Sequence, residues 1–326
     1  MMYLQLAGGL LLLLGAAEVM IRGAVGLARG FGLSPLFIGM TVVALGTSAP
    51  ELLVSLNAGL GGNGAIATGN IIGSNIANIL LIVGAAALLA PAARRKDKLY
   101  RDGALLVACT ALFIVLGWSG ELDRASGILL LVLFAAFMGS TYWRDINDPA
   151  ASAERITEVE EIGTIPARPW LAGLATLGGL GGIVLGADLM VTGGVALARA
   201  AGISEEVIGL TLIAVGTSLP ELAASAVAAL RGHADVALGN IVGSNMFNML
   251  AVGGVVAVVS PLPFSSEMLS FDVWVMLGST LLIVPLMVGW VGLSRLGGAL
   301  FVLLYAAYLA AQVFGLPGIV AERLMP

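Results

Sequence analysis

The sequence predicts an all-α integral membrane protein with about ten transmembrane helices, arranged as two inverted repeats of five helices. Three observations support this prediction. Hydrophobic residues make up 59% of the 326 residues and charged residues only 11%, whereas a soluble globular chain carries roughly 25% charged residues. Apolar runs of about 20 residues, which is the length that crosses roughly 30 Å of hydrocarbon, recur along the whole chain. A long internal repeat relates the two halves.

The apolar runs and the helix-breaking residues between them place the spans. In the first half the predicted helices cover residues 3–28, 34–60, 65–89, 103–118 and 125–142. In the second half they cover residues 169–198, 204–230, 235–259, 268–290 and 293–314. The opening run lacks a basic segment and a polar cleavage site, so we expect a retained helix and not a signal peptide.

One hydrophilic linker divides the chain into two repeats. We expect the first repeat at residues 1–143, a cytoplasmic linker at 144–168 and the second repeat at 169–326. The linker is too short to fold alone. At a constant offset, residues 32–91 match residues 202–261 with about 28 identities over roughly 60 positions. Because each half contains an odd number of spans, the second half enters the bilayer from the opposite side, which makes the repeat inverted.

A polar motif interrupts an apolar helix in both repeats. The first copy reads Gly-Thr-Ser-Ala-Pro-Glu and ends at Glu51, and the second reads Gly-Thr-Ser-Leu-Pro-Glu and ends at Glu221. Proline has no N–H and crowds the carbonyl four residues earlier, so we expect the second and seventh helices to be broken at the motif. A carbonyl released in hydrocarbon needs another partner, and a cation can be that partner.

Oxygen-bearing side chains accompany each glutamate at helical spacing, and the third and eighth helices, also expected to be broken, add more of them. The side chains that repeat are Thr47, Ser48, Ser55, Ser74 and Asn78, and Thr217, Ser218, Ser225, Ser244 and Asn248. Hard oxygen donors without His or Cys suit Ca²⁺ or Na⁺ and disfavour Zn²⁺ or copper. The inverted repeat predicts that both oxygen sets meet at one ion site near the bilayer midplane.

The charge of this site favours exchange over leak. One Ca²⁺, or two or more Na⁺, would neutralise two carboxylates, whereas an empty and doubly ionised site is costly in a low-dielectric setting. A single copy of the motif could instead be a structural kink beside a protonated glutamate. Duplication of the whole oxygen set in inverted context favours the ion site.

The charged residues outside the motifs indicate orientation and environment. If the N-terminus is outside, most Lys and Arg residues fall on the cytoplasmic side, including the cluster from Arg94 to Arg101, so we expect both termini outside the cytoplasm. Membrane lipids are the expected surroundings, and neither nucleic acid nor an obligatory protein partner is indicated. Glu18 and Asp188 are expected to line an access path or to bond to an adjacent helix. His233 is expected to be a solvated loop residue.

These motifs resemble the cation/Ca²⁺ antiporter superfamily, in particular its prokaryotic sodium/calcium exchanger branch. The resemblance rests on Gly-Thr-Ser-X-Pro-Glu and Gly-Ser-Asn-X-X-Asn in both halves and covers essentially the whole chain. It implies a Na⁺/Ca²⁺ antiporter of the plasma (inner) membrane that works by alternating access, extrudes Ca²⁺, needs no cofactor and is not an enzyme, with helices 1 and 6 sliding across the core. The positions that it implies for the ions are Glu51, Glu221, Thr47, Thr217, Ser48, Ser218, Ala44, Ala214, Ser74, Ser244, Asn78 and Asn248.

Other functions stay open at this point. Proton/calcium exchangers of the superfamily resemble Gly-Asn-Ala-X-Glu at the motif, so Thr47 and Ser48 favour Na⁺. Potassium-requiring members carry Asp where this chain has Asn248, so the neutral amide argues against a K⁺ requirement. A channel would conduct without a counter-ion, and nothing resembles a ring-forming filter. A membrane enzyme would need cationic partners, and neither motif contains Arg, Lys or His.

Overall fold

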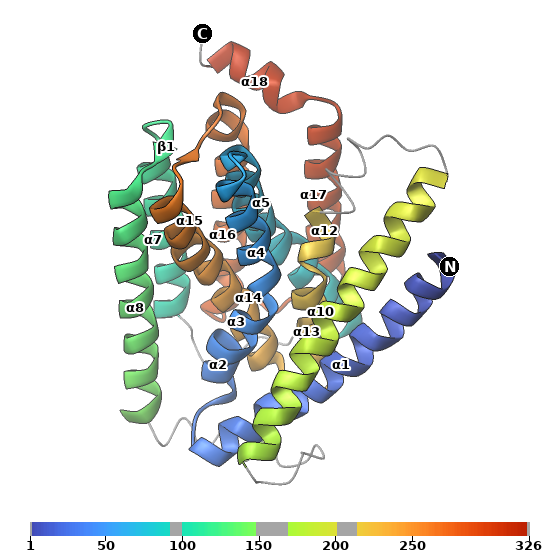
Figure 1. The fold of residues 1–326 in the computed structure, drawn as a ribbon. Helices are drawn as coiled ribbons and strands as arrows, with labels where there is room; N and C mark the ends of the chain where they lie inside the picture. The colour runs from blue at the N-terminus through green and yellow to red at the C-terminus, as the bar shows by residue number, and fades with distance from the viewer. Residues whose placement is uncertain (1, 92–99, 148–168, 201–213, 325–326) are drawn as a thin grey trace. The chain divides into compact units, whose positions relative to one another are not determined.

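The computed structural model describes residues 2–91, 100–147, 169–200 and 214–324 (Figure 1). Contacts divide the chain into two compact units. The first unit comprises Met1–Ser48 and Ala136–Ser244, and the second comprises Ala49–Ala135 and Asn245–Pro326. Each unit combines segments from both halves of the sequence, so this division cuts across the two predicted repeats. The arrangement as inverted repeats stays a prediction.

The first unit contains helices from both halves of the sequence. Its elements are α1 (Met2–Phe31), α2 (Pro35–Ile38), the π-helix η1 (Gly39–Val43), α3 (Ala44–Thr47), α10 (Pro169–Ala200), α12 (Ala214–Thr217), α13 (Leu219–Leu230) and most of α14 (Ala234–Met246). The last turns of α8 (Arg124–Asn147) also belong to it. There Ser34, just before α2, donates its backbone N–H to Asp145 Oδ2 over 2.8 Å, which joins the two helix ends.

The long helices α1 and α10 lie side by side and antiparallel (Figure 1). Glycines line the seam between them: a Cβ added at Gly23 would lie 2.6 Å from the backbone N of Thr176, and one added at Gly186 would lie 2.7 Å from that of Leu13. Small residues allow this backbone approach, as they do in many membrane helix pairs. The seam therefore tolerates no larger side chain at these positions.

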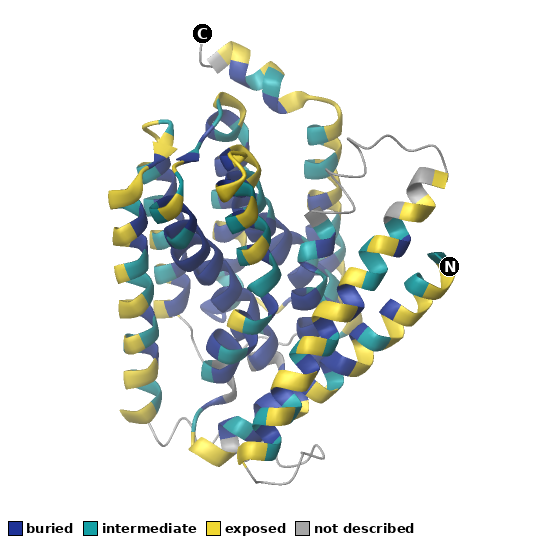
Figure 2. Cartoon of the chain, viewed as in Figure 1, coloured by how far each residue is buried: buried dark blue, intermediate teal, exposed yellow. Residues whose placement is uncertain are grey.

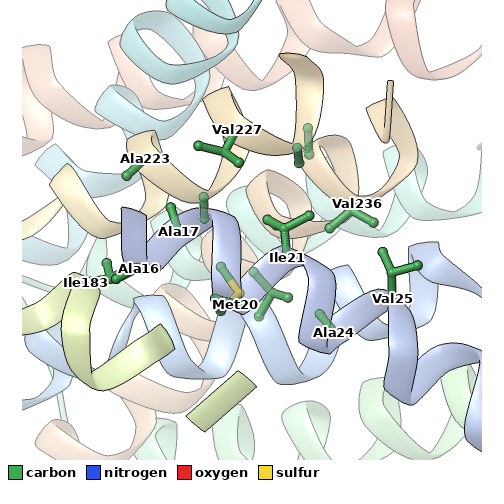
Figure 3. Packing of buried hydrophobic residues seen from close by; sticks show 14 of the residues in the cluster. Ala16, Ala17, Met20, Ile21, Ala24, Val25, Ile183, Ala223, Val227 and Val236 are labelled. Carbon is green, nitrogen blue, oxygen red and sulfur yellow. The ribbon is translucent and has the colours of Figure 1, made fainter. Parts of the chain in front are cut away.

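An apolar cluster joins α1 to α13 and to the start of α14. Figure 3 shows Ala17 and Ile21 of α1 on the side that faces Ala223 and Val227 of α13, with Val236 of α14 beside them. These side chains are all less than 9% exposed. The packing positions α13, which carries Glu221, against the middle of α1.

An ion-pair cluster reinforces this contact at the end of α13. The Glu18 carboxylate accepts from Arg22 Nε over 2.6 Å and pairs with Arg231 Nη2, also over 2.6 Å. Of the two expectations for Glu18, the bond to an adjacent helix is the one observed. His233, expected to be solvated, is only 7% exposed, and the solvated prediction was wrong because the turn after α13 folds back under the helix end, with His233 N bonded to Ala228 O.

The second unit contains the remaining helices and one short strand pair. Its elements are α4 (Ala49–Leu60), α5 (Gly64–Ala77), η2 (Asn78–Val83), α6 (Gly84–Leu89), α7 (Tyr100–Gly117), β1 (Glu121–Leu122), most of α8 (Arg124–Asn147), η4 (Phe247–Val252), α15 (Gly253–Val259), β2 (Leu262–Pro263), η5 (Met268–Asp272), α16 (Val273–Met287), α17 (Arg295–Val313) and α18 (Leu316–Leu324). The strands pair antiparallel, with Glu121 opposite Pro263.

Within the described residues, eight helices are long and apolar enough to cross a membrane, and nine if the bent pair around Ser48 counts as one span. About ten spans were expected; the predicted seventh helix begins in residues 204–213, outside the described part. The third and eighth helices were expected to be broken and are instead continuous, because neither contains a proline. Each passes through a π-helical turn, at η2 and η4.

Burial separates the inner spans from the outer ones (Figure 2). Within an 18-residue apolar stretch of each span, 78% and 89% of the residues are buried in Gly64–Leu89 and Val236–Val259, against 22% in Arg124–Asn147 and 17% in Arg295–Val313. Exposed leucine, valine and tryptophan side chains cover the outer helices. Such an apolar surface is suited to lipid, whereas the two inner spans carry the Gly-Ser-Asn motifs in protein surroundings.

Candidate ion-binding site

Both motif helices are interrupted at the predicted place. Between α3 and α4, Ser48 leaves the helical conformation with φ −85° and ψ 6°, and the helix bends by 49°. Between α12 and α13, Ser218 has φ −89° and ψ 3°. In each case the proline that follows occupies the first turn of the next helix, where its missing N–H costs nothing. The sequence-based prediction of two broken helices is confirmed.

The carboxylate of Glu221 lies fully buried in the first unit, next to the break in the other motif. Ser48 Oγ donates a hydrogen bond of 2.8 Å to Glu221 Oε1. The second oxygen, Oε2, is buried and has no hydrogen-bond partner among the described residues. A buried carboxylate with an unsatisfied oxygen needs a proton or a cation. Ser48 and Glu221 come from opposite halves of the sequence, so here the structure brings together two residues that the motifs predicted.

Thr47 and Glu221 are further connected through Asn240 of α14. Thr47 Oγ1 lies 3.2 Å from Asn240 Oδ1 and 3.4 Å from the carbonyl oxygen of Ala44. Asn240 Nδ2 donates to Ser225 Oγ over 2.9 Å and lies 3.5 Å from the Glu221 carbonyl oxygen. One buried amide thus contacts both broken helices of the unit.

The second unit repeats this arrangement around Glu51. Asn70 Nδ2 donates to Ser55 Oγ over 2.9 Å and to the Glu51 carbonyl oxygen over 3.3 Å. Glu51 itself is 1% exposed. The same three-residue pattern of asparagine, serine and glutamate carbonyl therefore forms twice, at equivalent positions of the sequence repeat.

A second polar cluster lies where the π-helical turns begin. Asn78 Nδ2, at the start of η2, donates to Asn245 Oδ1 over 3.1 Å. Asn248, within η4, is fully buried, and neither its Oδ1 nor its Nδ2 has a partner among the described residues. π-Turns occur frequently at functional sites because they displace backbone and side-chain groups from the helical register. These buried amides are suited to contact a polar or charged cargo.

The predicted site residues are divided between the two units. The first unit contains Ala44, Thr47, Ser48, Ala214, Thr217, Ser218, Glu221 and Ser244, and the second contains Glu51, Ser74, Asn78 and Asn248. The Ala214 side chain is outside the described residues. Ser244 Oγ is buried without a partner in the part of the chain that the structure describes. Convergence of Glu51 with Glu221 stays a prediction.

Sequence reasoning missed three asparagines of the site, Asn70, Asn240 and Asn245. Their signal was present, because each repeat contains Gly-Asn, two further residues and then the Gly-Ser-Asn element. A neutral amide inside an apolar helix does not by itself indicate an ion site. Identity between the two copies, however, marks Asn70 and Asn240 as a pair.

The buried polar side chains of both units offer hard oxygen donors. Among the described residues, no three His, Cys, Asp or Glu side chains lie close enough together to hold a metal ion. Carboxylate, hydroxyl, amide and backbone oxygens are the ligands used for Ca²⁺, whose coordination is flexible.

Comparison with known proteins agrees with this chemistry. Residues 1–143 and 171–314 match the family described as sodium/calcium exchanger protein. The putative antiporter CaxA of Alkalimonas amylolytica is 40% identical over 306 residues, covering 92% of this chain and 95% of that protein. The sodium/calcium exchanger MaX1 of Methanosarcina acetivorans is 32% identical over 347 residues, covering 96% and 98%.

A solved structure shows the same fold. The sodium-calcium exchanger NCX_Mj, soaked with 2.5 mM Na⁺ and 0.1 mM Ca²⁺, superimposes with a TM-score of 0.80 at 31% sequence identity, covering 94% of this chain and 97% of that one. The inner membrane protein YrbG of Escherichia coli is 38% identical over 259 residues, which is 78% of each chain. The chain therefore belongs to the sodium/calcium exchanger family of multi-pass membrane transporters, which are not enzymes.

Proposed function

We propose that this protein exchanges Na⁺ for Ca²⁺ by alternating access, with Glu221 and Glu51 as the charged ligands of the transported ions. The observation that supports it most directly is the buried Glu221 carboxylate. One of its oxygens is bonded to the Ser48 hydroxyl of the other motif, and the second oxygen has no partner among the described residues. A mobile cation would satisfy that buried oxygen.

The ligand set that we propose for Ca²⁺ combines charge with backbone oxygens. Ca²⁺ binds six to eight oxygens at about 2.3–2.6 Å. The carboxylates of Glu51 and Glu221 and the carbonyls of Thr47 and Thr217 would contribute to that shell. The proposed Na⁺ positions use Ala44, Ser48 and Ser74, their counterparts Ala214, Ser218 and Ser244, and a central position near Asn78 and Asn248.

Charge neutrality is what would couple the two ions. One Ca²⁺, or at least two Na⁺, balances the two carboxylates, so either cargo lets the site cross the low-dielectric region. An empty site would carry both charges through that region at high cost. Exchange is therefore favoured and slippage without cargo is suppressed.

The proposed orientation places both termini outside the cytoplasm, in the inner membrane of a prokaryote, because most basic residues then lie on the cytoplasmic side. The proposed direction is Ca²⁺ extrusion driven by Na⁺ entry. If one net positive charge enters per cycle, the membrane potential adds about 2.3 kcal/mol at roughly 100 mV.

The test is gradient-driven ⁴⁵Ca²⁺ flux in proteoliposomes of the purified full chain, with the proton gradient collapsed by an ionophore and K⁺ absent. An imposed Na⁺ gradient is expected to drive Ca²⁺ movement against its own gradient, and dissipating the Na⁺ gradient should stop it. Flux that follows the proton gradient alone would identify H⁺/Ca²⁺ exchange, and a strict need for K⁺ would identify K⁺-dependent exchange. Ca²⁺ conductance without any counter-ion would identify a channel.

A further inference from the structure

We propose that Asn240 is a positioning residue of the ion site, and that Asn70 has the same role in the other repeat. This inference rests on the proposed function, since it concerns how the ligands of the transported ions are held. Neither asparagine is one of the ion ligands proposed above. Each is proposed to act through the backbone and hydroxyl groups beside a motif glutamate.

Asn240 uses both ends of its amide. Its Nδ2 donates to Ser225 Oγ over 2.9 Å and approaches the Glu221 carbonyl to 3.5 Å, while its Oδ1 lies 3.2 Å from the Thr47 hydroxyl. The side chain is fully buried. Since buried amides are normally satisfied and costly to leave unpaired, these contacts fix the side chain in one orientation.

The backbone of η1 packs closely against α14 on both sides of Asn240, which holds the Asn240 backbone in place. A Cβ added at Gly39 of η1 would lie 2.8 Å from the Val236 carbonyl and 3.3 Å from the Asn240 backbone N. One added at Gly243 would lie 2.5 Å from the Met40 carbonyl. The segment that precedes Thr47 is thus pressed against α14 on both sides of Asn240. The amide spans the short distance from α14 to the break in the motif.

The contacts of Asn240 determine which atoms of Thr47 and Glu221 face the transported ion. When Thr47 donates its only hydroxyl hydrogen to Asn240 Oδ1, the lone pairs of Thr47 Oγ1 remain available to a cation. The bond to the Glu221 carbonyl fixes the backbone of that residue one turn after Ser218. Ligands must be held within about 0.5 Å of the productive geometry for tight binding. The amide therefore controls hydroxyl orientation and carboxylate placement together.

The pattern recurs in the second unit, where Asn70 contacts Ser55 Oγ and the Glu51 carbonyl in the same way. Duplication in both repeats argues against an incidental contact. It also supplies a second variant in which the idea can be tested.

The experiment measures the half-saturating Ca²⁺ concentration and the maximal rate of Na⁺-driven ⁴⁵Ca²⁺ flux for Asn240→Leu, a larger side chain that branches at the same Cγ atom but makes none of the three polar contacts. We expect the half-saturating concentration to rise by about tenfold while the maximal rate changes by less than about threefold. A buried hydroxyl outside the site provides the matched control: Thr110→Val, which removes a 2.8 Å bond to the Leu106 carbonyl, should leave both values unchanged.

Coupling to Ser225 separates positioning from general damage. Ser225→Ala removes the strongest contact of Asn240 and should raise the half-saturating Ca²⁺ concentration by about threefold. Because both single changes break the same bond, their effects should fail to add in the double variant. Independent effects that add in full would overturn the proposal.

Three further outcomes would overturn either this proposal or the proposed function. Wild-type Ca²⁺ affinity in folded Asn240→Leu, or in Asn70→Leu if the first variant cannot be purified, would overturn the proposal. Unchanged affinity in Ser225→Ala would do so even if neither asparagine variant folds. Absence of Na⁺-driven flux in the wild-type protein would instead refute the proposed function, so the two failures are distinguishable.

Discussion

The bond from Ser48 to Glu221 links the two halves of the sequence at the level of single atoms. Ser48 sits at the break of one motif, and Glu221 follows the break of the other, yet their side chains meet at 2.8 Å. A serine that donates to a carboxylate keeps its own lone pairs free for a cation. The pair can therefore offer several oxygens to one ion without adding a further charge.

Replacing Glu221 with Gln is expected to lower Na⁺-driven Ca²⁺ exchange by at least about a hundredfold, because it removes one of the two charges that balance the cargo. The amide keeps the shape of the carboxylate, so the protein should still elute as a folded species. The measurement is ⁴⁵Ca²⁺ flux in proteoliposomes, with Glu121→Gln, an exposed residue of β1, as the control. Exchange at the wild-type rate would remove Glu221 from the site.

At this scale the sequence singled out the carboxylate of Glu221 and the hydroxyl of Ser48, but not the amide of Asn240 that lies beside them. Glu221 and Ser48 were predictable because ionisable and polar groups are rare in apolar helices and were duplicated. Asn240 was missed because the role proposed for it depends on which backbone and hydroxyl groups pack around it. That information comes from the contact between η1 and α14, which no local pattern encodes.

The helices themselves followed from the sequence to within a few residues, since lipid requires long apolar runs and proline interrupts them. The predicted helix at 65–89 is observed as Gly64–Leu89, and the predicted helix at 268–290 as Met268–Met287. The π-turns η1, η2 and η4 were not predictable, because an extra residue per turn is stabilised by tertiary packing. The short terminal helix α18 also escaped prediction.

The N-terminus of α8 leads to a prediction about how the stability of the protein depends on pH. Asp123 precedes α8 and accepts a 2.8 Å hydrogen bond from the Ser126 backbone N–H, which lowers the pKa of its carboxyl below the ordinary value. A lowered folded-state pKa stabilises the protein at neutral pH, and this stabilisation is lost as the pH falls through the folded pKa.

Asp123→Asn keeps the capping oxygen and removes the charge, so it isolates this effect. The melting temperature of the wild type should exceed that of the variant at pH 7, and the difference should shrink as the pH falls below about 4. The measurement is thermal unfolding of the detergent-purified protein across this range. A difference that does not change with pH would contradict the assigned cause.

At the scale of the whole molecule, the glycine seam between α1 and α10 predicts that a larger side chain destabilises the protein at some positions of α10 and not at others. Gly186→Leu would place its Cβ 2.7 Å from the Leu13 backbone N, and that backbone cannot move aside as a flexible side chain can. Overpacking of this kind costs about 1–3 kcal/mol. We expect a lower melting temperature and slower exchange.

Gly181→Leu on the same helix is the control, because a Cβ there would meet no atom within 4 Å. It should match the wild type in both thermal unfolding and ⁴⁵Ca²⁺ flux. Equal losses in the two variants would show that the effect comes from helix propensity and not from the seam.

The same seam constrains any motion that α1 and α10 make. Their backbones touch at several levels along the pair, from the Gly9 contact with the Gly186 carbonyl to the Gly23 contact with Thr176. Neither helix can tilt away without opening these contacts, nor turn about its axis without driving side chains into the neighbouring backbone. We therefore expect α1 and α10 to move as one rigid body, so that a displacement of either helix also displaces the other.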